Sequence, residues 1–123
     1  MLVSNRIKII VKWIKTYCED NKKSHLIIGI SGGVDSAVTS TLCAKTGLKV
    51  IPISMPILQN KKLHNRSLAH VYWLKNKFSN IEFANNDLSE VFTVFRNTLK
   101  MYPSEHGLAN SQARLRMTAL YQV

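Results

Sequence analysis

An apolar run, Leu26-Ile27-Ile28-Gly29-Ile30, passes directly into the polar stretch Ser31-Gly32-Gly33-Val34-Asp35-Ser36. The run is short, continuous and rich in β-branched residues, which is typical of a strand buried on both faces of a parallel sheet. Two adjacent glycines then break the strand, and helical spacing begins at about residue 34. The segment therefore predicts a strand, a tight turn and a helix, which together are the repeating unit of an α/β fold.

The turn has the chemistry of a phosphate-binding site. Adjacent glycines let the main chain approach a ligand closely, and successive N–H groups in such a turn form a concavity that binds anions. The following helix adds unpaired donors and the positive end of its dipole. Ser31 and Ser36 can donate to phosphate oxygens, and Asp35 can hold a Mg²⁺ ion that bridges to them. The candidate phosphate-binding residues are Gly29, Ile30, Ser31, Gly32, Gly33, Val34, Asp35 and Ser36.

The same stretch also fits an ordinary turn between a strand and a helix. In that interpretation Asp35 only counters the helix dipole and Ser36 has no role. The stretch is not a Walker A loop, because no Gly-Lys-Ser or Gly-Lys-Thr follows, and it lacks the Gly-x-Gly-x-x-Gly fingerprint of dinucleotide-binding folds. Its position after an apolar strand favours the phosphate site.

Helical and strand patterns alternate along the rest of the chain. Apolar spacing predicts strands at 26–30, 48–54 and 81–84, and helices at 7–17, 34–45, 62–78, 88–99 and 107–123. Asp87 and Glu90 match a capping box at the start of the fourth helix. This order predicts an α/β fold, a parallel sheet with flanking helices. The last helical pattern reaches Val123 without a stop signal, so we expect residues 1–123 to be the N-terminal part of a larger single domain.

Composition narrows the class of protein. Of the 123 residues, 46% are hydrophobic and 20% are charged, as in an ordinary folded domain. The longest apolar runs are far shorter than the ~20 residues that span a bilayer, so no membrane association is expected. The formal net charge of +10 fits a partner that carries phosphates. The basic residues form no block, which argues against a nucleic-acid-binding tail.

Cysteine, histidine and tryptophan give weaker indications. Cys18 and Cys43 form no metal-binding or redox motif, so we expect buried, reduced thiols and a cytoplasmic location. The 4 histidines are scattered and predict no metal site. Trp13 and Trp73 fall on apolar faces, which predicts a place in the core and not on a base-stacking surface.

Two motifs carry a resemblance to known enzymes. Ser31-Gly32-Gly33-Val34-Asp35-Ser36 resembles the PP-loop signature, Ser-Gly-Gly-x-Asp-Ser, of the ATP pyrophosphatase superfamily. The later stretch Ala109-Asn110-Ser111-Gln112-Ala113-Arg114-Leu115-Arg116-Met117 resembles the Asn-x-Lys/Gln-Ala-Arg-x-Arg-Met segment of ammonia-dependent NAD synthetases. The resemblance covers most of the chain and is loosest over residues 57–106.

This resemblance implies a Rossmann-like adenine nucleotide alpha hydrolase fold, here with about three strands, and a ligase. Such enzymes use ATP to amidate deamido-NAD (nicotinic acid adenine dinucleotide) with ammonia, through an adenylated carboxylate, and release NAD, AMP and pyrophosphate. Residues 29–36 would then bind ATP, and Asp35 would bind Mg²⁺. Arg114 would bind deamido-NAD from a last helix that also forms a homodimer interface. Main chain near Ser54-Met55-Pro56 would cradle the adenosine, and no catalytic residue is assigned.

Two alternatives remain open at this point. The loop alone also fits another PP-loop enzyme, such as a tRNA-modifying or GMP synthetase-like ATP pyrophosphatase. Members of the NAD synthetase family continue for about as many residues again, and that part supplies a Glu for the metal and Thr and Lys residues for the phosphates of ATP. Those groups have no counterpart here, so a chain that folds and dimerises without turnover is the second alternative.

Overall fold

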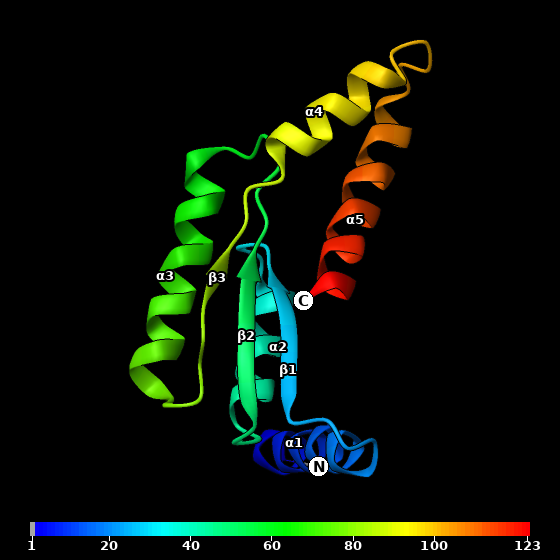
Figure 1. The fold of residues 1–123 in the computed structure, drawn as a ribbon. Helices are drawn as coiled ribbons and strands as arrows, with labels where there is room; N and C mark the ends of the chain where they lie inside the picture. Colours follow the sequence, from blue (N-terminus) through cyan, green and yellow to red (C-terminus); the bar gives the residue numbers. More distant parts are fainter. Residues whose placement is uncertain (1) are drawn as a thin grey trace.

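The computed structural model describes residues 2–123, which form five helices and three strands (Figure 1). In chain order these are α1 (Val3–Asp20), β1 (His25–Ile30), α2 (Val34–Ala44), β2 (Lys49–Ser54), α3 (Lys61–Lys77), β3 (Ala84–Asn85), α4 (Ser89–Thr98) and α5 (Glu105–Gln122). The predicted alternation of helices and strands is confirmed. Within these residues, no helix is both long enough and apolar enough to cross a membrane.

β2 lies in the middle of a parallel sheet with the strand order β1-β2-β3. β1 pairs with β2 over the full length of both strands, from His25 opposite Lys49 to Ile30 opposite Ser54. Most of β2 is buried, and its Ile53 side chain is 1% exposed. The predicted α/β class and the parallel direction of the strands are therefore confirmed.

β1 differs from its prediction. Of its residues only Ile30 is buried, whereas Leu26, Ile27 and Ile28 are half-buried, so the expectation of a strand buried on both faces is wrong. The reason is the position of β1 at the edge of the sheet. In the part of the chain that the structure describes, no strand pairs with its outer side.

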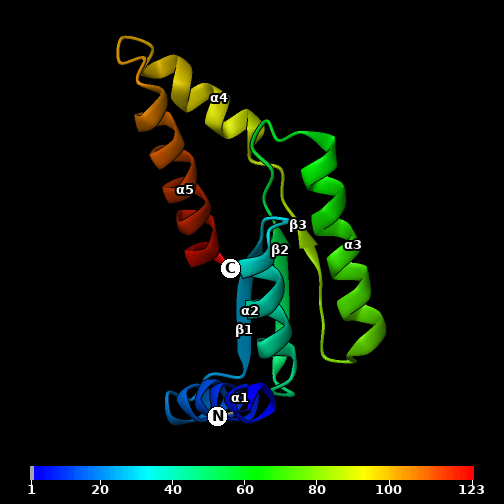
Figure 2. The same cartoon turned by 180° about the vertical axis from the view of Figure 1, so that it is seen from behind.

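The helices are distributed unevenly around the sheet. α2 packs against β1 and β2, and Figure 2 shows it in front of these strands, on the face turned away in Figure 1. α1 crosses the end at which the strands begin and contacts α2. α4 and α5 form an arm beyond the carboxyl ends of the strands, and α5 returns toward β1. This arm therefore stands over the edge at which open α/β sheets bind ligands.

Side-chain caps set where two helices begin. Asn60 caps α3 and Ser104 caps α5, and each side chain accepts a hydrogen bond from the backbone amide three residues later, at 2.9 Å and 3.1 Å. The predicted capping box before α4 is not formed. The carboxylate of Asp87 accepts from the amide of Ser89 at 2.8 Å, two residues later, and not from the amide of Glu90.

β3 is shorter than the strand predicted at 81–84. It comprises only Ala84–Asn85, which pairs with the end of β2. Ile81 forms an isolated bridge with Val50 instead of starting the strand. Residues 81–85 therefore pair with β2 at two separate places and do not form one continuous strand.

The prediction that Trp13 and Trp73 are core residues is wrong. Their side chains are 64% and 44% exposed. They stack on neighbouring rings at the surface, Trp13 on Tyr17 and Trp73 on His70. α1 buries only Cys18, because this helix lies across the end of the sheet and not on one of its faces.

Candidate nucleotide-binding site

Gly32 lies in the loop between β1 and α2, where two conditions require glycine. Its φ of +87° belongs to the left-handed region, which residues with a side chain rarely adopt. A Cβ atom at this position would lie 2.6 Å from the carbonyl oxygen of Leu63, in the first turn of α3. The loop can therefore pass this close to α3 only because Gly32 has no side chain.

Hydrogen bonds between two serines hold the loop in shape. The Ser36 hydroxyl accepts from the amide of Ser31 at 3.1 Å and donates to the carbonyl oxygen of Gly33 at 3.2 Å. The two hydroxyls lie 3.1 Å apart, and that of Ser31 accepts from the amide of Gly33 at 3.2 Å. The hydroxyls predicted to contact phosphate thus also fix the conformation of the loop around them.

The first turn of α2 presents backbone donors beside this loop. Among the described residues, no acceptor pairs with the amides of Val34, Asp35 or Ser36, whereas the amide of Ala37 donates to Gly33 at 3.3 Å. Unpaired donors at a helix N-terminus, together with the positive end of the dipole, attract anions. The loop and the helix therefore bring together the donors that a phosphate site requires.

Asp35 is exposed on the first turn of α2. It forms no ion pair within residues 2–123, and those residues contain no group of three or more His, Cys, Asp or Glu side chains that could hold a metal ion. A lone carboxylate suits Mg²⁺, which usually keeps several waters and binds one or two carboxylates together with substrate phosphates. Asp35 thus fits Mg²⁺ that arrives with a phosphate ligand.

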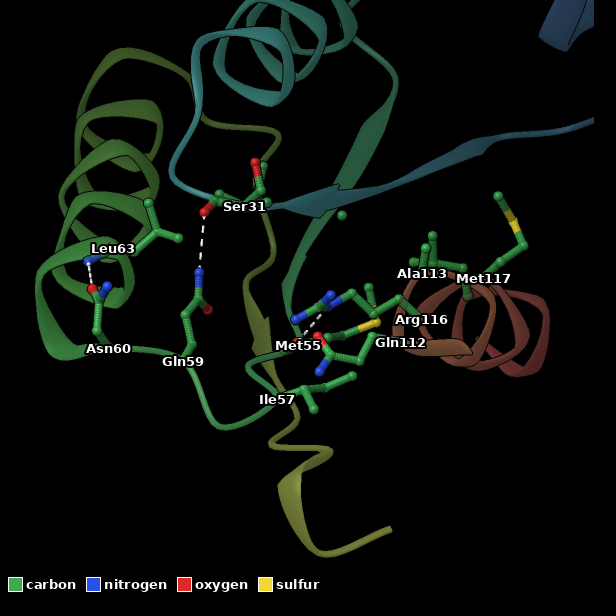
Figure 3. A pocket seen from close by; sticks show the side chains of 13 residues that line it. Ser31, Met55, Ile57, Gln59, Asn60, Leu63, Gln112, Ala113, Arg116 and Met117 are labelled. Carbon is green, nitrogen blue, oxygen red and sulfur yellow. Dashed lines mark hydrogen bonds between the residues drawn. The ribbon is translucent and has the colours of Figure 1, made fainter. Parts of the chain in front are cut away.

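A cavity of about 660 Å³ opens at the carboxyl edge of the sheet, between the start of α3 and α5 (Figure 3). Its wall is formed by Gly29, Ile30, Ser31, Met55, Ile57, Gln59, Asn60, Leu63, Gln112, Ala113, Arg116, Met117 and Leu120. The volume falls in the range of roughly 300–1,000 Å³ that is usual for ligand pockets. Of the predicted phosphate-binding residues, Gly29, Ile30 and Ser31 line the cavity, whereas Gly32–Ser36 are not part of its wall.

Arg116 reaches from α5 to the end of β2. Its Nε donates to the carbonyl oxygen of Met55 at 2.9 Å, and its side chain is half-buried (Figure 3). Burial lowers the pKa of the Arg116 guanidinium from its usual value. Sequence analysis gave Arg116 no role. Gln112, one helical turn earlier, lines the same cavity. The i, i+4 spacing of Gln112 and Arg116 is a sequence signal that the two side chains share one face of the helix.

Arg114 lies elsewhere on α5. It is exposed, and its Nη1 donates to the carbonyl oxygen of Asn110 in the same helix at 3.4 Å. Arg114 does not line the cavity, whereas Ser31 of the loop does. The structure therefore does not bring these two predicted site residues together. Its predicted role in binding deamido-NAD stays a prediction.

Comparison with known proteins identifies the family to which the chain belongs. A family model described as NAD synthase matches residues 6–123. The chain belongs to the NAD synthase family. The NH₃-dependent NAD⁺ synthetase of Finegoldia magna is 35% identical over 115 residues, a match that covers 91% of this chain and 45% of the relative. That of Mycoplasmopsis pulmonis is 33% identical over 113 residues and covers 91% and 42%. The chain thus spans less than half the length of these NAD synthase relatives.

Solved structures of NAD synthase relatives share the fold described here. An NMN synthetase from Francisella tularensis superimposes with a TM-score of 0.86 at 28% identity, over 99% of this chain and 50% of that one. The NH₃-dependent NAD synthetase from Campylobacter jejuni, in complex with nitrate, gives a TM-score of 0.83 at 26% identity, over 99% and 52%. The predicted family and the predicted fold are both confirmed.

Proposed function

We propose that this chain binds ATP and takes part in the amidation of deamido-NAD by ammonia, which yields NAD, AMP and pyrophosphate. The observation that carries the proposal is the free amide cluster of Val34–Ser36 in the first turn of α2, in a member of the NAD synthase family. The cavity of about 660 Å³, whose wall includes Ser31 of the same loop, would supply space for the nucleoside. Met55 and Ile57 are buried in its wall and offer an apolar surface for a base.

The proposed chemistry depends on charge stabilisation and positioning. The carboxylate of deamido-NAD attacks the α-phosphorus of ATP and pyrophosphate leaves, after which ammonia displaces AMP from the adenylated carboxylate. The amides of α2 would hold the phosphates while negative charge moves onto pyrophosphate. The hydroxyls of Ser31 and Ser36 would join them by turning from their partners within the loop. Mg²⁺, which Asp35 would hold, neutralises phosphate charge when it is bound. Holding both substrates in line lowers the remaining barrier, and no general base is assigned.

The second substrate and a second subunit are part of the proposal. Arg114 would bind the diphosphate or the carboxylate of deamido-NAD, for which a guanidinium fork is suited. A homodimer would form through α5. The exposure of Met117 (53%) and Tyr121 (85%) on this helix supports this arrangement. These two side chains lie one helical turn apart, at i and i+4, and a contiguous exposed apolar patch commonly marks an interface.

We also propose a reducing compartment, the cytoplasm, as the location. Cys18 and Cys43 are both free and both buried. Burial raises the pKa of the Cys43 thiol, and the nearby Cys18 raises it further, which keeps this residue in its unreactive form. Free, inert thiols suit a compartment that keeps cysteines reduced.

A second candidate function is the amidation that forms NMN. It is supported by the superposition on the NMN synthetase of Francisella tularensis, with its TM-score of 0.86. The chemistry would be the same, because a carboxylate is adenylated and then displaced by ammonia. Only the size of the substrate differs, a mononucleotide in place of a dinucleotide.

The binding half of the proposal is tested by calorimetry with ATP in the presence of Mg²⁺ and in EDTA. We expect Asp35→Asn to weaken MgATP binding about tenfold or more and to cause no loss of affinity in EDTA. Asp20→Asn, an exposed carboxylate at the end of α1, is the matched control and should bind as the unmodified chain does. Failure of the unmodified chain to bind ATP would overturn the proposed function.

The reaction is tested with ATP, Mg²⁺, ammonium and either deamido-NAD or nicotinic acid mononucleotide. AMP and the amidated product are measured by chromatography. Product from deamido-NAD supports the first candidate, and product from the mononucleotide alone supports the second. ATP binding without any product would show a chain that binds nucleotide without turnover and would contradict catalysis by these 123 residues.

A further inference from the structure

Arg116 is a half-buried cation in the wall that α5 contributes to the cavity. Figure 3 shows its side chain extending from α5 toward Met55, with Ser31 and the start of α3 on the other side of the cavity. Within residues 2–123, its hydrogen bond from Nε to Met55, at 2.9 Å, is the one bond that the guanidinium makes. The two amino groups of the fork, Nη1 and Nη2, therefore have donors to spare.

Among residues 2–123, no carboxylate forms an ion pair with this charge. The residues that line the cavity include no Asp and no Glu. Among the described residues the ion pair is Lys49–Glu82, at 3.0 Å, in which Arg116 has no part. A partly buried cation without a counter-ion is costly, and burial accordingly lowers the pKa of Arg116. The guanidinium stays protonated at neutral pH, so an anion that enters the cavity gains from its charge.

The bond to Met55 also fixes the direction of the fork. A guanidinium held at Nε loses less freedom when its amino groups bind a ligand, because its orientation is already set. Arg114, two residues earlier, is exposed, and its hydrogen bond within the described part of the chain stays inside α5. Of these two arginines, only Arg116 lines the cavity.

We propose that Arg116 binds a phosphate group of a nucleotide in this cavity, from the wall opposite Ser31, while the Met55 main chain fixes its fork. This inference rests on the proposed function, since it takes a nucleotide as the ligand. It adds a cationic contact to the site, beyond the neutral donors of the loop and of the first turn of α2. It also makes α5 part of the nucleotide site.

The test compares three ligands that differ only in phosphate, namely adenosine, AMP and ATP. Their affinities are measured by titration of the unmodified chain, Arg116→Gln, Arg116→Lys and Arg96→Gln. Arg96 is an exposed arginine in the last turn of α4, so Arg96→Gln removes the same charge away from the cavity. We expect Arg116→Gln to weaken AMP and ATP about tenfold to a hundredfold and to leave adenosine unchanged. Arg96→Gln should change none of the three, and Arg116→Lys should fall between.

Three results would overturn the inference. Unchanged affinity of Arg116→Gln for ATP and AMP would show that the fork does not touch phosphate. An equal loss for adenosine would show that Arg116 only ties α5 to Met55 and shapes the cavity. An unmodified chain that binds neither ATP nor AMP would overturn the proposed function and this inference with it. The first two results overturn the inference about Arg116 alone, so the two failures can be distinguished.

Discussion

Gly32 allows the loop to contact α3 because it has no Cβ atom. Gly47, which also has a positive φ, provides a comparison. Gly32 and Gly47 have φ values of +87° and +79°. A Cβ at Gly32 would meet backbone at 2.6 Å, whereas at Gly47 nothing lies within 4 Å. We expect Gly47→Ala to lower the free energy of unfolding by about 1 kcal/mol, from backbone strain alone. Gly32→Ala should cost about 2–3 kcal/mol, because the clash adds to the strain.

Urea unfolding followed by circular dichroism measures both variants. Gly33→Ala is the control within the loop, since Gly33 has a φ of −89° and its added Cβ would meet only the Ser31 hydroxyl, at 3.4 Å. Equal losses for Gly32→Ala and Gly47→Ala would show that the approach of α3 does not restrict this position.

His70 gives the chain a pH-dependent stability. Its Nε2 is hydrogen-bonded to the Ser40 hydroxyl at 2.8 Å, and its ring stacks on Trp73. Burial lowers the pKa of His70 below its usual value, so the unfolded chain binds the proton more tightly than the folded one. The contribution of His70 is therefore fully present above a pH of about 6.5 and is lost as the pH falls below it.

We expect the urea midpoint of the unmodified chain to fall between about pH 7.5 and about pH 5, and to fall less in His70→Gln. His106→Gln, at an exposed position in the first turn of α5, should keep the full pH dependence. The same slope in His70→Gln as in the unmodified chain would contradict the assignment to His70.

At the scale of elements, α3 depends on its cap. Asn60 accepts a hydrogen bond from the amide of Leu63 at 2.9 Å, which satisfies one of the free donors at the start of the helix. We expect Asn60→Ala to lower the free energy of unfolding by about 1 kcal/mol. Asn65→Ala, at an exposed position inside α3, should be neutral or slightly stabilising, because alanine is the better helix former. Urea unfolding of both variants checks this, and an equal loss in the two would refute the cap.

The elements with a strong local pattern could be predicted from sequence. The apolar run before Ser31 and the two glycines after it predicted β1, the loop and α2, because strand, turn and helix follow from neighbouring residues. What depends on distant neighbours could not be predicted. The exposure of Trp13 follows from the place of α1 at the end of the sheet, and the open side of β1 follows from strand order.

The same distinction applies to the candidate site. The donors of the loop lie within one local segment, so sequence alone could group them. Their role in binding phosphate stays a prediction. The bond between Arg116 and Met55 joins residues 61 positions apart, and no local pattern indicates it. Sequence reasoning therefore chose Arg114 from the motif and passed over Arg116, which only the packing of α5 brings to the cavity.

At the scale of the whole molecule, the apolar surface of α5 predicts self-association. Tyr121 is 85% exposed near the end of this helix. If α5 forms the proposed homodimer interface, a charge there must be buried without a partner, which is strongly unfavourable. We expect the unmodified chain to be a dimer and Tyr121→Glu to be a monomer in light scattering coupled to size-exclusion chromatography. Tyr72→Glu, at a tyrosine 62% exposed on α3, should remain a dimer. A monomeric unmodified chain would refute the interface.

The unpaired side of β1 has a consequence for the chemistry next to it. Alternate residues of an edge strand direct their backbone groups outward, where they accept a further strand. A further strand that paired in parallel with His25–Ile30 would end beside Ser31, where the loop begins. Residues that follow such a strand would then lie near the phosphates that the loop is proposed to hold. Among the described residues, the open side of β1 therefore offers a place from which residues of an added strand would come close to the proposed phosphate site.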